Sequence, residues 1–229
     1  MATNKRFIAR LHEESLVFPD PRFANDDGLL AWGGDLSSER LLVAYSQGIF
    51  PWFNEGDPLL WWSPNPRVLL YPQQMKVSKS LQKSMKHFEI RYDTSFEKVM
   101  RLCLETRKEC GKKSWISEAL IEAFCALHVK GFAHSVECYK DNHLVGGLYG
   151  LYLGGVFCGE SMFSTTKDAS KTALFGLCQK LIENGGDVID CQLPTQHLSS
   201  LGAISVLRDD FLELLQNSLK KATQRGTQW

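Results

Sequence analysis

The sequence predicts a mixed α/β fold, with a small N-terminal domain over residues 1–80 and a larger α/β domain over residues 81–229. From about residue 90 onward, segments of alternating hydrophobicity are interleaved with segments of helical periodicity, which is typical of a sheet covered by helices. Residues 16–72 differ, because they hold seven of the eight prolines and four of the six tryptophans. This change in composition predicts a boundary between the two parts.

Two helices are expected in the first part. Ser37 is a suitable N-cap for a helix whose apolar residues follow at helical spacing and which Gly48 ends. A second helix starts at Ser78, with apolar residues on one face and lysines on another.

The second part reads as a regular succession of strands and helices. The expected order is strand 88–92, helix 95–110, helix 117–130, strand 133–139, strands 144–152 and 156–163 joined at Gly154-Gly155, helix 169–184, strand 187–193 and helix 209–219. This β-α-α-β-β-β-α-β-α order is that of an acyltransferase-like mixed sheet.

Composition restricts the function classes. The 26 basic residues balance the 26 acidic residues, which excludes a uniformly basic nucleic-acid coat but allows a local basic patch. The seven cysteines show no C-x-x-C spacing and sit mostly in apolar surroundings, as reduced thiols of a cytosolic protein do. The polar N-terminus leads into no segment of signal or membrane length, so we expect a cytoplasmic protein without a membrane partner.

The most informative feature is a carboxylate and an amide, Asp190 and Gln192, within the short apolar run 187–193. In a strand, these alternate positions point to one side, together with Val188. Burying such a polar couple is costly unless it has a partner. We therefore expect a site that handles an amine or another polar reacting group.

A second candidate is Glu160, in the middle of the predicted strand 156–163. Strand alternation places it on one face with Cys158 and Met162. It is either a solvated edge carboxylate or an acceptor for an ammonium group. The helix after it, near Asp168 and Ser170, has either an ordinary N-cap or free N–H groups that bind a polar ligand atom.

Common catalytic signatures are absent from the sequence. There is no G-x-S-x-G, no Walker loop, no H-E-x-x-H and no G-x-G-x-x-G that opens a helix. Of the six dispersed histidines, His134, His143 and His197 are candidate site neighbours, although each is more typical of an ordinary hydrogen-bonded residue. No metal site is expected.

Aromatic and basic residues suggest RNA. Trp52 and Trp115 belong to a dense group of aromatic residues, which fill cores or stack against nucleic-acid bases. A lysine row on the predicted helix after Ser78 is either a solvated face or a set of phosphate contacts. The lysine row consists of Lys79, Lys83 and Lys86. Further basic residues that could contact phosphates are Arg107, Lys108, Lys112 and Lys113.

A series of longer motifs resembles one known family. The segments are 18–21 (FPDP), 27–36 (DGLLAWGGDL), 48–53 (GIFPWF), 61–64 (WWSP), 133–137 (AHSVE), 144–150 (LVGGLYG), 159–164 (GESMFS), 169–171 (ASK), 189–192 (IDCQ) and 200–203 (SLGA). In this order they closely resemble the leucyl/phenylalanyl-tRNA–protein transferases, over about residues 10 to 212. Ser38 and Asn65 depart from the family pattern, where Pro and Asp are expected.

The resemblance implies transfer of Leu or Phe, and less well Met, from aminoacyl-tRNA to proteins with N-terminal Lys or Arg, which marks them for N-degron proteolysis. It also implies a C-terminal domain related to the GNAT acyltransferases and no ATP, metal or organic cofactor. We expect the protein to be a monomer. The partners would be Leu-tRNA or Phe-tRNA and the acceptor protein or peptide.

The resemblance also implies roles for individual residues. Asp190 polarises Gln192 or attracts the cationic acceptor, as base, relay or electrostatic anchor, while Gln192 contacts the attacking amine. Glu160 lies near the aminoacyl amine and the terminal ribose, and Trp52 and Trp115 pack against the terminal adenosine. The expected aminoacyl pocket consists of Leu148, Phe157, Ser164, Leu174, Leu177 and Leu181. From their spacing alone, Lys79, Lys83 and Lys86 would bind phosphates of the acceptor stem.

Two alternatives remain at this point. One is a GNAT-like acyltransferase that uses acyl-CoA, although the pyrophosphate loop expected before the main helix is replaced by residues 164–169 (STTKDA). The other is a catalytically silent RNA-binding module, for which Asp190, Gln192 and Glu160 would have no use.

Overall fold

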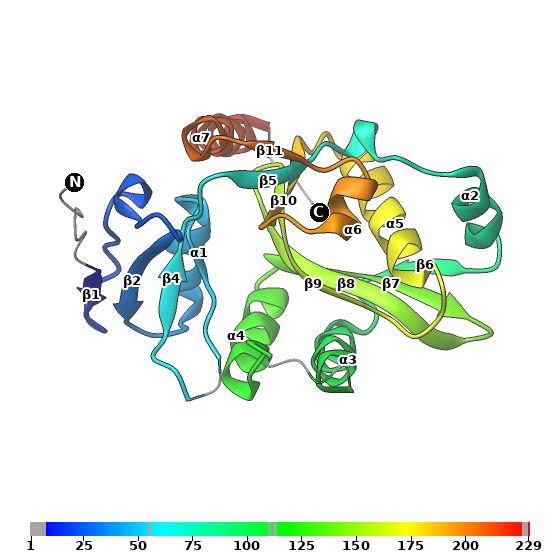
Figure 1. The fold of residues 1–229 in the computed structure, drawn as a ribbon, viewed down its shortest axis with the longest axis horizontal. Coiled ribbons are helices and arrows are strands. Elements are labelled where there is room, and N and C mark those ends of the chain that lie inside the picture. Colours follow the sequence, from blue (N-terminus) through cyan, green and yellow to red (C-terminus); the bar gives the residue numbers. More distant parts are fainter. Residues whose placement is uncertain (1–7, 55, 110, 112–113, 226–228) are drawn as a thin grey trace.

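The computed structural model describes residues 8–54, 56–109, 111, 114–225 and 229. Its elements form two sheets and the helices that pack on them (Figure 1). The predicted mixed α/β class is confirmed.

The smaller sheet is built from the proline-rich part of the chain. Its strands are short and lie in the order β1-β2-β4-β3, with α1 beside them. Their bounds are β1 Ala9–Leu11, β2 Leu29–Gly33, α1 Ser38–Ser46, β3 Phe50–Pro51 and β4 Leu60–Trp62. The Ser37 side chain accepts a hydrogen bond from the Arg40 N–H, which confirms the predicted cap of α1.

The larger sheet has seven strands in the order β11-β5-β10-β9-β8-β7-β6. Their bounds are β5 Arg67–Leu70, β6 Glu89–Tyr92, β7 Ala133–Lys140, β8 His143–Leu153, β9 Val156–Ser164, β10 Val188–Gln192 and β11 Ile204–Val206. All neighbours are antiparallel except β9 and β10, which run parallel. Strands β6 to β10 correspond to predicted strands, whereas β5 and β11 were not predicted.

Helices cover both faces of the larger sheet. In Figure 1, α5 lies on one face, while α3 and α4 lie on the other. The bounds are α2 Lys79–Met85, α3 Phe96–Glu109, α4 Glu118–Val129, α5 Ala169–Glu183, α6 Gln196–Ser200 and α7 Arg208–Arg225. The short α6 was not predicted. Helices α2 to α5 lie at their predicted positions, and α7 starts where predicted but continues to Arg225, beyond the predicted end at residue 219. No helix in the described ranges is long and apolar enough to cross a bilayer.

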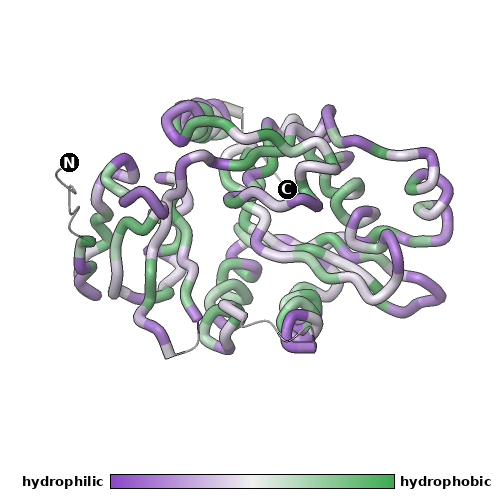
Figure 2. The backbone as a smooth tube through the Cα atoms, in the orientation of Figure 1, coloured by the Kyte–Doolittle hydropathy of each residue, from purple (hydrophilic) through white to green (hydrophobic). Residues whose placement is uncertain are grey.

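Two hydrophobic cores hold the fold together. One lies under α5 and contains Leu148, Phe157 and Leu177. The other extends from the small sheet, with Trp61, to the opposite face of the large sheet, with Phe124. Figure 2 shows hydrophobic segments concentrated in the inner strands and helices, and hydrophilic segments at the outer turns. The boundary at residue 80 stays a prediction, but β5, which precedes that boundary, pairs within the large sheet.

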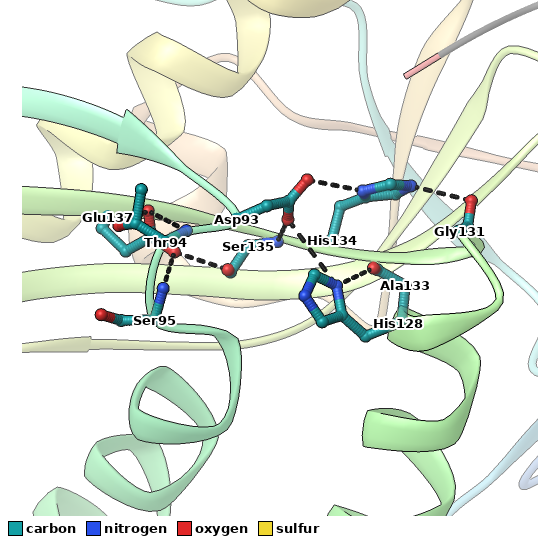
Figure 3. A network of polar contacts seen from close by, with 9 residues as sticks. All are labelled: Asp93, Thr94, Ser95, His128, Gly131, Ala133, His134, Ser135 and Glu137. Carbon is teal, nitrogen blue, oxygen red and sulfur yellow. Dashed lines mark hydrogen bonds and ion pairs between the residues drawn. The ribbon is translucent and has the colours of Figure 1, made fainter.

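A polar network fixes the corner between β6 and α3 (Figure 3). Asp93 adopts a φ of 57° and accepts hydrogen bonds from the Ser135 N–H and from His134 Nδ1, each at 2.8 Å. Glu137 accepts hydrogen bonds from Thr94, Ser95 and Ser135, and burial raises its pKa.

The same corner brings Asp93, His128 and His134 close enough to share one ion. However, His134 Nε2 also contacts the Gly131 carbonyl, and His128 Nδ1 contacts the Ala133 carbonyl. These contacts explain why the three side chains lie together, because each of them takes part in the hydrogen bonds that hold this corner.

Candidate active site

The candidate site lies where the parallel strands β9 and β10 separate. Their pairing runs from Val188↔Val156 to Asp190↔Cys158 and stops there. Each strand carries a β-bulge at that point, because Glu160 has no partner on β8 and Cys191 has none on β5. Bulges redirect side chains, and here they turn Glu160 and Gln192 into the gap between the strands.

The bulge in β9 corrects the predicted strand faces. Phe157 and Met162 face the core under α5, whereas Cys158 and Phe163 face the opposite core. The expectation that Cys158, Glu160 and Met162 share one face is therefore wrong, because the extra residue at Glu160 reverses the alternation.

Glu160 is the centre of the site. Its Oε1 accepts hydrogen bonds from the Tyr45 hydroxyl at 2.7 Å and from Gln192 Nε2 at 3.3 Å. Desolvation raises the pKa of Glu160 to about 8, although the Tyr45 hydrogen bond opposes this rise. A carboxyl group with such a pKa takes up and returns a proton near neutral pH.

Asp190 lies behind this site. Its two oxygens accept hydrogen bonds from Arg67, at 2.8 Å from Nε and 2.6 Å from Nη2, and both side chains are almost completely buried. Burial opposes the charge of Arg67, but Asp190 raises its pKa overall. Asp190 Oδ1 also accepts the Gln192 N–H at 3.0 Å, which holds Gln192 in a left-handed conformation with a φ of 56°.

A cavity of about 580 Å³ opens at the separation of the strands. It takes its lining from both sides of the large sheet, including Leu148 and Phe157 on one side and Phe50 and Tyr149 on the other. Glu160 and Gln192 line it, whereas Asp190 is absent from its wall. The cavity is thus an apolar chamber with a small polar centre, as expected for a site that binds a small organic group.

Four of the six predicted pocket residues line the cavity: Leu148, Phe157, Leu174 and Leu177. The other two lie elsewhere. Ser164 donates to the Thr166 carbonyl and accepts the Ser170 N–H, so its hydroxyl stabilises the start of α5. Leu181 is buried in the core one turn beyond Leu177.

The predicted aromatic residues Trp52 and Trp115 also line the cavity, and their ring centroids lie 6.3 Å apart. Arg107, also part of the lining, lies over the Trp115 ring at 3.8 Å from its centroid. In contrast, Lys79, Lys83 and Lys86 are exposed on or directly after α2 and do not reach the cavity. Lys112 and Lys113 lie outside the described residues.

Several residues of the site were missed by sequence reasoning. Tyr45 lies on α1 and Arg67 on β5, far along the chain from their partners Glu160 and Asp190. The sequence held one sign that Arg67 could be a site residue, because this charged residue directly precedes the apolar run 68–70. Thr195, the N-cap of the unpredicted α6, also lines the cavity and was missed. His197 on α6 lines the cavity as well; it is one of the three histidines named as candidate site neighbours, and burial together with Lys171 lowers its pKa.

Comparison with known families agrees with this geometry. Residues 69–216 match the family described as leucyl/phenylalanyl-tRNA protein transferase, and residues 34–65 match the N-terminal domain of the same family. The chain belongs to this family. It is accordingly an aminoacyltransferase, and the predicted membership is confirmed.

Individual relatives are similar along nearly their whole length. The leucyl/phenylalanyl-tRNA–protein transferase of Desulforapulum autotrophicum is 50% identical over 215 residues, which cover 93% of this chain and 94% of that protein. The transferase of Nitrosospira multiformis is 54% identical over 206 residues, with 89% and 88% covered.

Solved structures are similar only remotely. The C-terminal domain of a lysylphosphatidylglycerol synthetase from Agrobacterium fabrum aligns with a TM-score of 0.43 and 8% identity, over 82% of this chain and 58% of that chain. A GCN5-related N-acetyltransferase from Kribbella flavida aligns with a TM-score of 0.30 and 12% identity, over 71% and 58%. Scores this low add nothing to the family assignment.

Proposed function

We propose that this aminoacyltransferase moves Leu or Phe, and less well Met, from aminoacyl-tRNA to the α-amine of proteins that begin with Lys or Arg. The names of the relatives support the tRNA and protein substrates. The choice of Lys or Arg, and the N-degron fate of the product, rest on the family resemblance.

The observation that carries the proposal is the contact between Glu160 and Gln192 at the polar centre of an apolar cavity. Leu148, Leu174 and Leu177 offer an apolar surface to a Leu or Phe side chain. The polar centre then lies beside the ester group that joins the amino acid to the ribose. An apolar pocket alone discriminates only modestly between similar side chains, so slow transfer of Met is in keeping with it.

The reaction needs positioning and proton transfer. The neutral acceptor amine attacks the ester carbonyl, a C–N bond forms, and the C–O bond to the ribose breaks. The proton lost by the amine has to reach the departing ribose oxygen. Glu160 suits this transfer because its pKa of about 8 lies near the pKa of the acceptor amine, roughly 8 in model compounds. Since the ester is already activated, no ATP, metal or organic cofactor is required.

Gln192 and Asp190 have separate roles in this proposal. The Gln192 amide contacts the reacting amine, while Asp190 acts as a positioning residue through Arg67 and the Gln192 N–H. Of the roles left open by the sequence, direct contact of Asp190 with the acceptor receives the least support, because both of its oxygens are engaged with Arg67 and it does not line the cavity.

The start of α5 argues against the acyl-CoA alternative. A pyrophosphate site at a helix N-terminus needs free N–H groups. Here the Ala169 N–H donates to the Thr166 carbonyl, and the Ser170 N–H donates to Ser164 Oγ. The RNA-binding alternative leaves the costly Glu160–Gln192 centre without a purpose.

The remaining parts of the proposal concern assembly and location. The protein is proposed to act as a monomer. Aminoacyl-tRNA is a cytoplasmic substrate, so the cytoplasm is the proposed location.

A transfer assay tests the proposal. Purified protein, radiolabelled Leu-tRNA and a peptide with N-terminal Arg are expected to give labelled peptide without ATP. The same peptide with an acetylated N-terminus lacks the nucleophile and should stay unlabelled, and a peptide with N-terminal Ala tests the choice of acceptor. Absence of label from the Arg peptide would refute the function, whereas equal labelling of the Ala peptide would refute only the acceptor preference.

The variant for this assay is Gln192→Ala, with an expected loss of about 100-fold in kcat/KM, the size of effect of one hydrogen-bonding group in an active site. Asp190→Ala is less suitable, because it leaves the Arg67 charge buried without its partner, which costs about 3 to 5 kcal/mol of stability.

A further inference from the structure

Arg107 near the C-terminal end of α3 is a lining residue to which the proposed chemistry gives no role. Among the described residues of the cavity wall, it is the one lysine or arginine. Its side chain is half-buried at the wall of the cavity, and the Nε atom of its guanidinium is shielded from solvent. Its charge acts on the neighbouring Tyr149 and lowers the pKa of that hydroxyl, against the rise that burial causes.

The orientation of Arg107 is set by stacking. Its guanidinium carbon lies 3.8 Å from the centre of the Trp115 ring, within the range of a strong cation–π contact. One face of Trp115 is therefore occupied. The neighbouring Trp52 is 37% exposed and meets Trp115 edge to face, which leaves Trp52 as the more open surface for a base.

A stacked guanidinium keeps its N–H groups in the plane of the fork, directed away from the ring. Such a fork matches the oxygens of a phosphate and binds two of them at once. In the proposed function, the ligand at this end of the cavity is the 3′ end of a tRNA. The group nearest to its terminal adenosine that carries a charge is the phosphate on the 5′ side of that nucleoside.

We propose that Arg107 binds this last phosphodiester of the tRNA, next to the aromatic surface that receives the terminal adenosine. The inference rests on the proposed function and deepens it, since it names which phosphate the cavity recognises. Arg107 would then fix the depth at which the 3′ end enters, and with it the distance of the ester from Glu160.

The test compares ligands that differ by this phosphate alone. Adenosine 5′-monophosphate and adenosine are bound to the protein in equilibrium dialysis, and Leu-tRNA and 3′-leucyl-adenosine are used as donors in the transfer assay. Arg107→Gln removes the charge and keeps most of the stem, Arg107→Lys keeps the charge without the planar fork, and thermal unfolding shows whether each variant is folded. Arg101→Gln on the same helix is the control, because Arg101 pairs with Glu97 and Glu118 outside the cavity.

Arg107→Gln is expected to weaken the binding of adenosine 5′-monophosphate about tenfold or more, which is the effect of losing one charge-assisted contact. The binding of adenosine should stay unchanged. In transfer, KM for Leu-tRNA should rise while 3′-leucyl-adenosine reacts as before, and the salt slope of Leu-tRNA binding should fall by about 0.7. Arg107→Lys should recover part of the loss.

If Arg107→Gln weakened the binding of adenosine and of adenosine 5′-monophosphate equally, the inference would be overturned, because Arg107 would then only support Trp115. No weakening of either would overturn it as well. If the wild-type protein transferred no Leu at all, the proposed function would fail. The dialysis with adenosine 5′-monophosphate and adenosine would still decide whether Arg107 selects a phosphate.

Discussion

At the scale of single residues, Glu160 is the group whose protonation links the site to the stability of the fold. Desolvation raises its pKa to about 8, from an ordinary value of 4.5. Between these pH values the folded protein holds a proton that the unfolded chain has lost. Stability contributed by this group is complete below about pH 4.5 and is lost as the pH rises through about 8.

Glu160→Gln removes this dependence while preserving the shape of the side chain. Thermal unfolding of the wild type and the variant is measured from pH 5 to pH 8.5. The Tm of the variant should rise relative to the Tm of the wild type as the pH increases. In a chain of this size, a relative rise in Tm of about 2 to 4 °C corresponds to about 1 kcal/mol in the free energy of unfolding. A difference in Tm that stays constant across this range would contradict the raised pKa. In the transfer assay the variant should also lose activity, because the amide cannot accept the proton.

At the scale of elements, hydrophobic periodicity predicts the long strands and helices, whereas very short strands and the two bulges leave no pattern in the sequence. The long strands and helices after residue 90 have hydrophobic periods that predict them closely. Strands of two or three residues, such as β1 and β3, are too short to show a period. A bulge adds one residue without changing composition, so the alternation around Glu160 predicted the wrong faces. The pairing of Arg67 with Asp190 joins positions 123 residues apart and has no local signal.

Strand β8 accommodates the site through Gly150. A Cβ atom at that position would lie 2.2 Å from the Cys158 carbonyl oxygen and 2.5 Å from the Phe157 ring. Gly150→Ala should therefore lower the free energy of unfolding by about 1 to 3 kcal/mol, as overpacking does. Gly159→Ala is the matched control, because its Cβ would meet atoms no closer than 3.8 Å. Urea unfolding of both variants measures the difference, and similar midpoints would show that β8 and β9 can move apart at little cost.

At the scale of the whole molecule, the cavity and the lysine row lie in different parts of the fold. The cavity lies between β9 and β10, whereas α2 projects at the end of the molecule near β6 (Figure 1). A tRNA extends well beyond its 3′ end, so contacts to its stem at α2 would act independently of the chemistry at Glu160.

Lys83→Ala tests this separation. It should weaken Leu-tRNA binding and reduce the salt slope by about 0.9, the contribution of one phosphate contact on a duplex. Transfer from 3′-leucyl-adenosine should be unaffected, because that donor has no stem. Lys220→Ala on α7, also exposed, is the control. A salt slope equal to that of the wild type would remove α2 from the tRNA-binding surface.

The position of β5 has a consequence for how this chain can be divided. The strand follows the small sheet in sequence, yet it lies between β10 and β11 and brings Arg67 to Asp190. A cut between Trp62 and Arg67 would leave the large sheet whole, whereas a cut at residue 80 would take one of its inner strands away and expose the backbone of β10. We therefore expect an exchange of the first part between relatives to preserve the large sheet only when its junction lies in the few residues before Arg67.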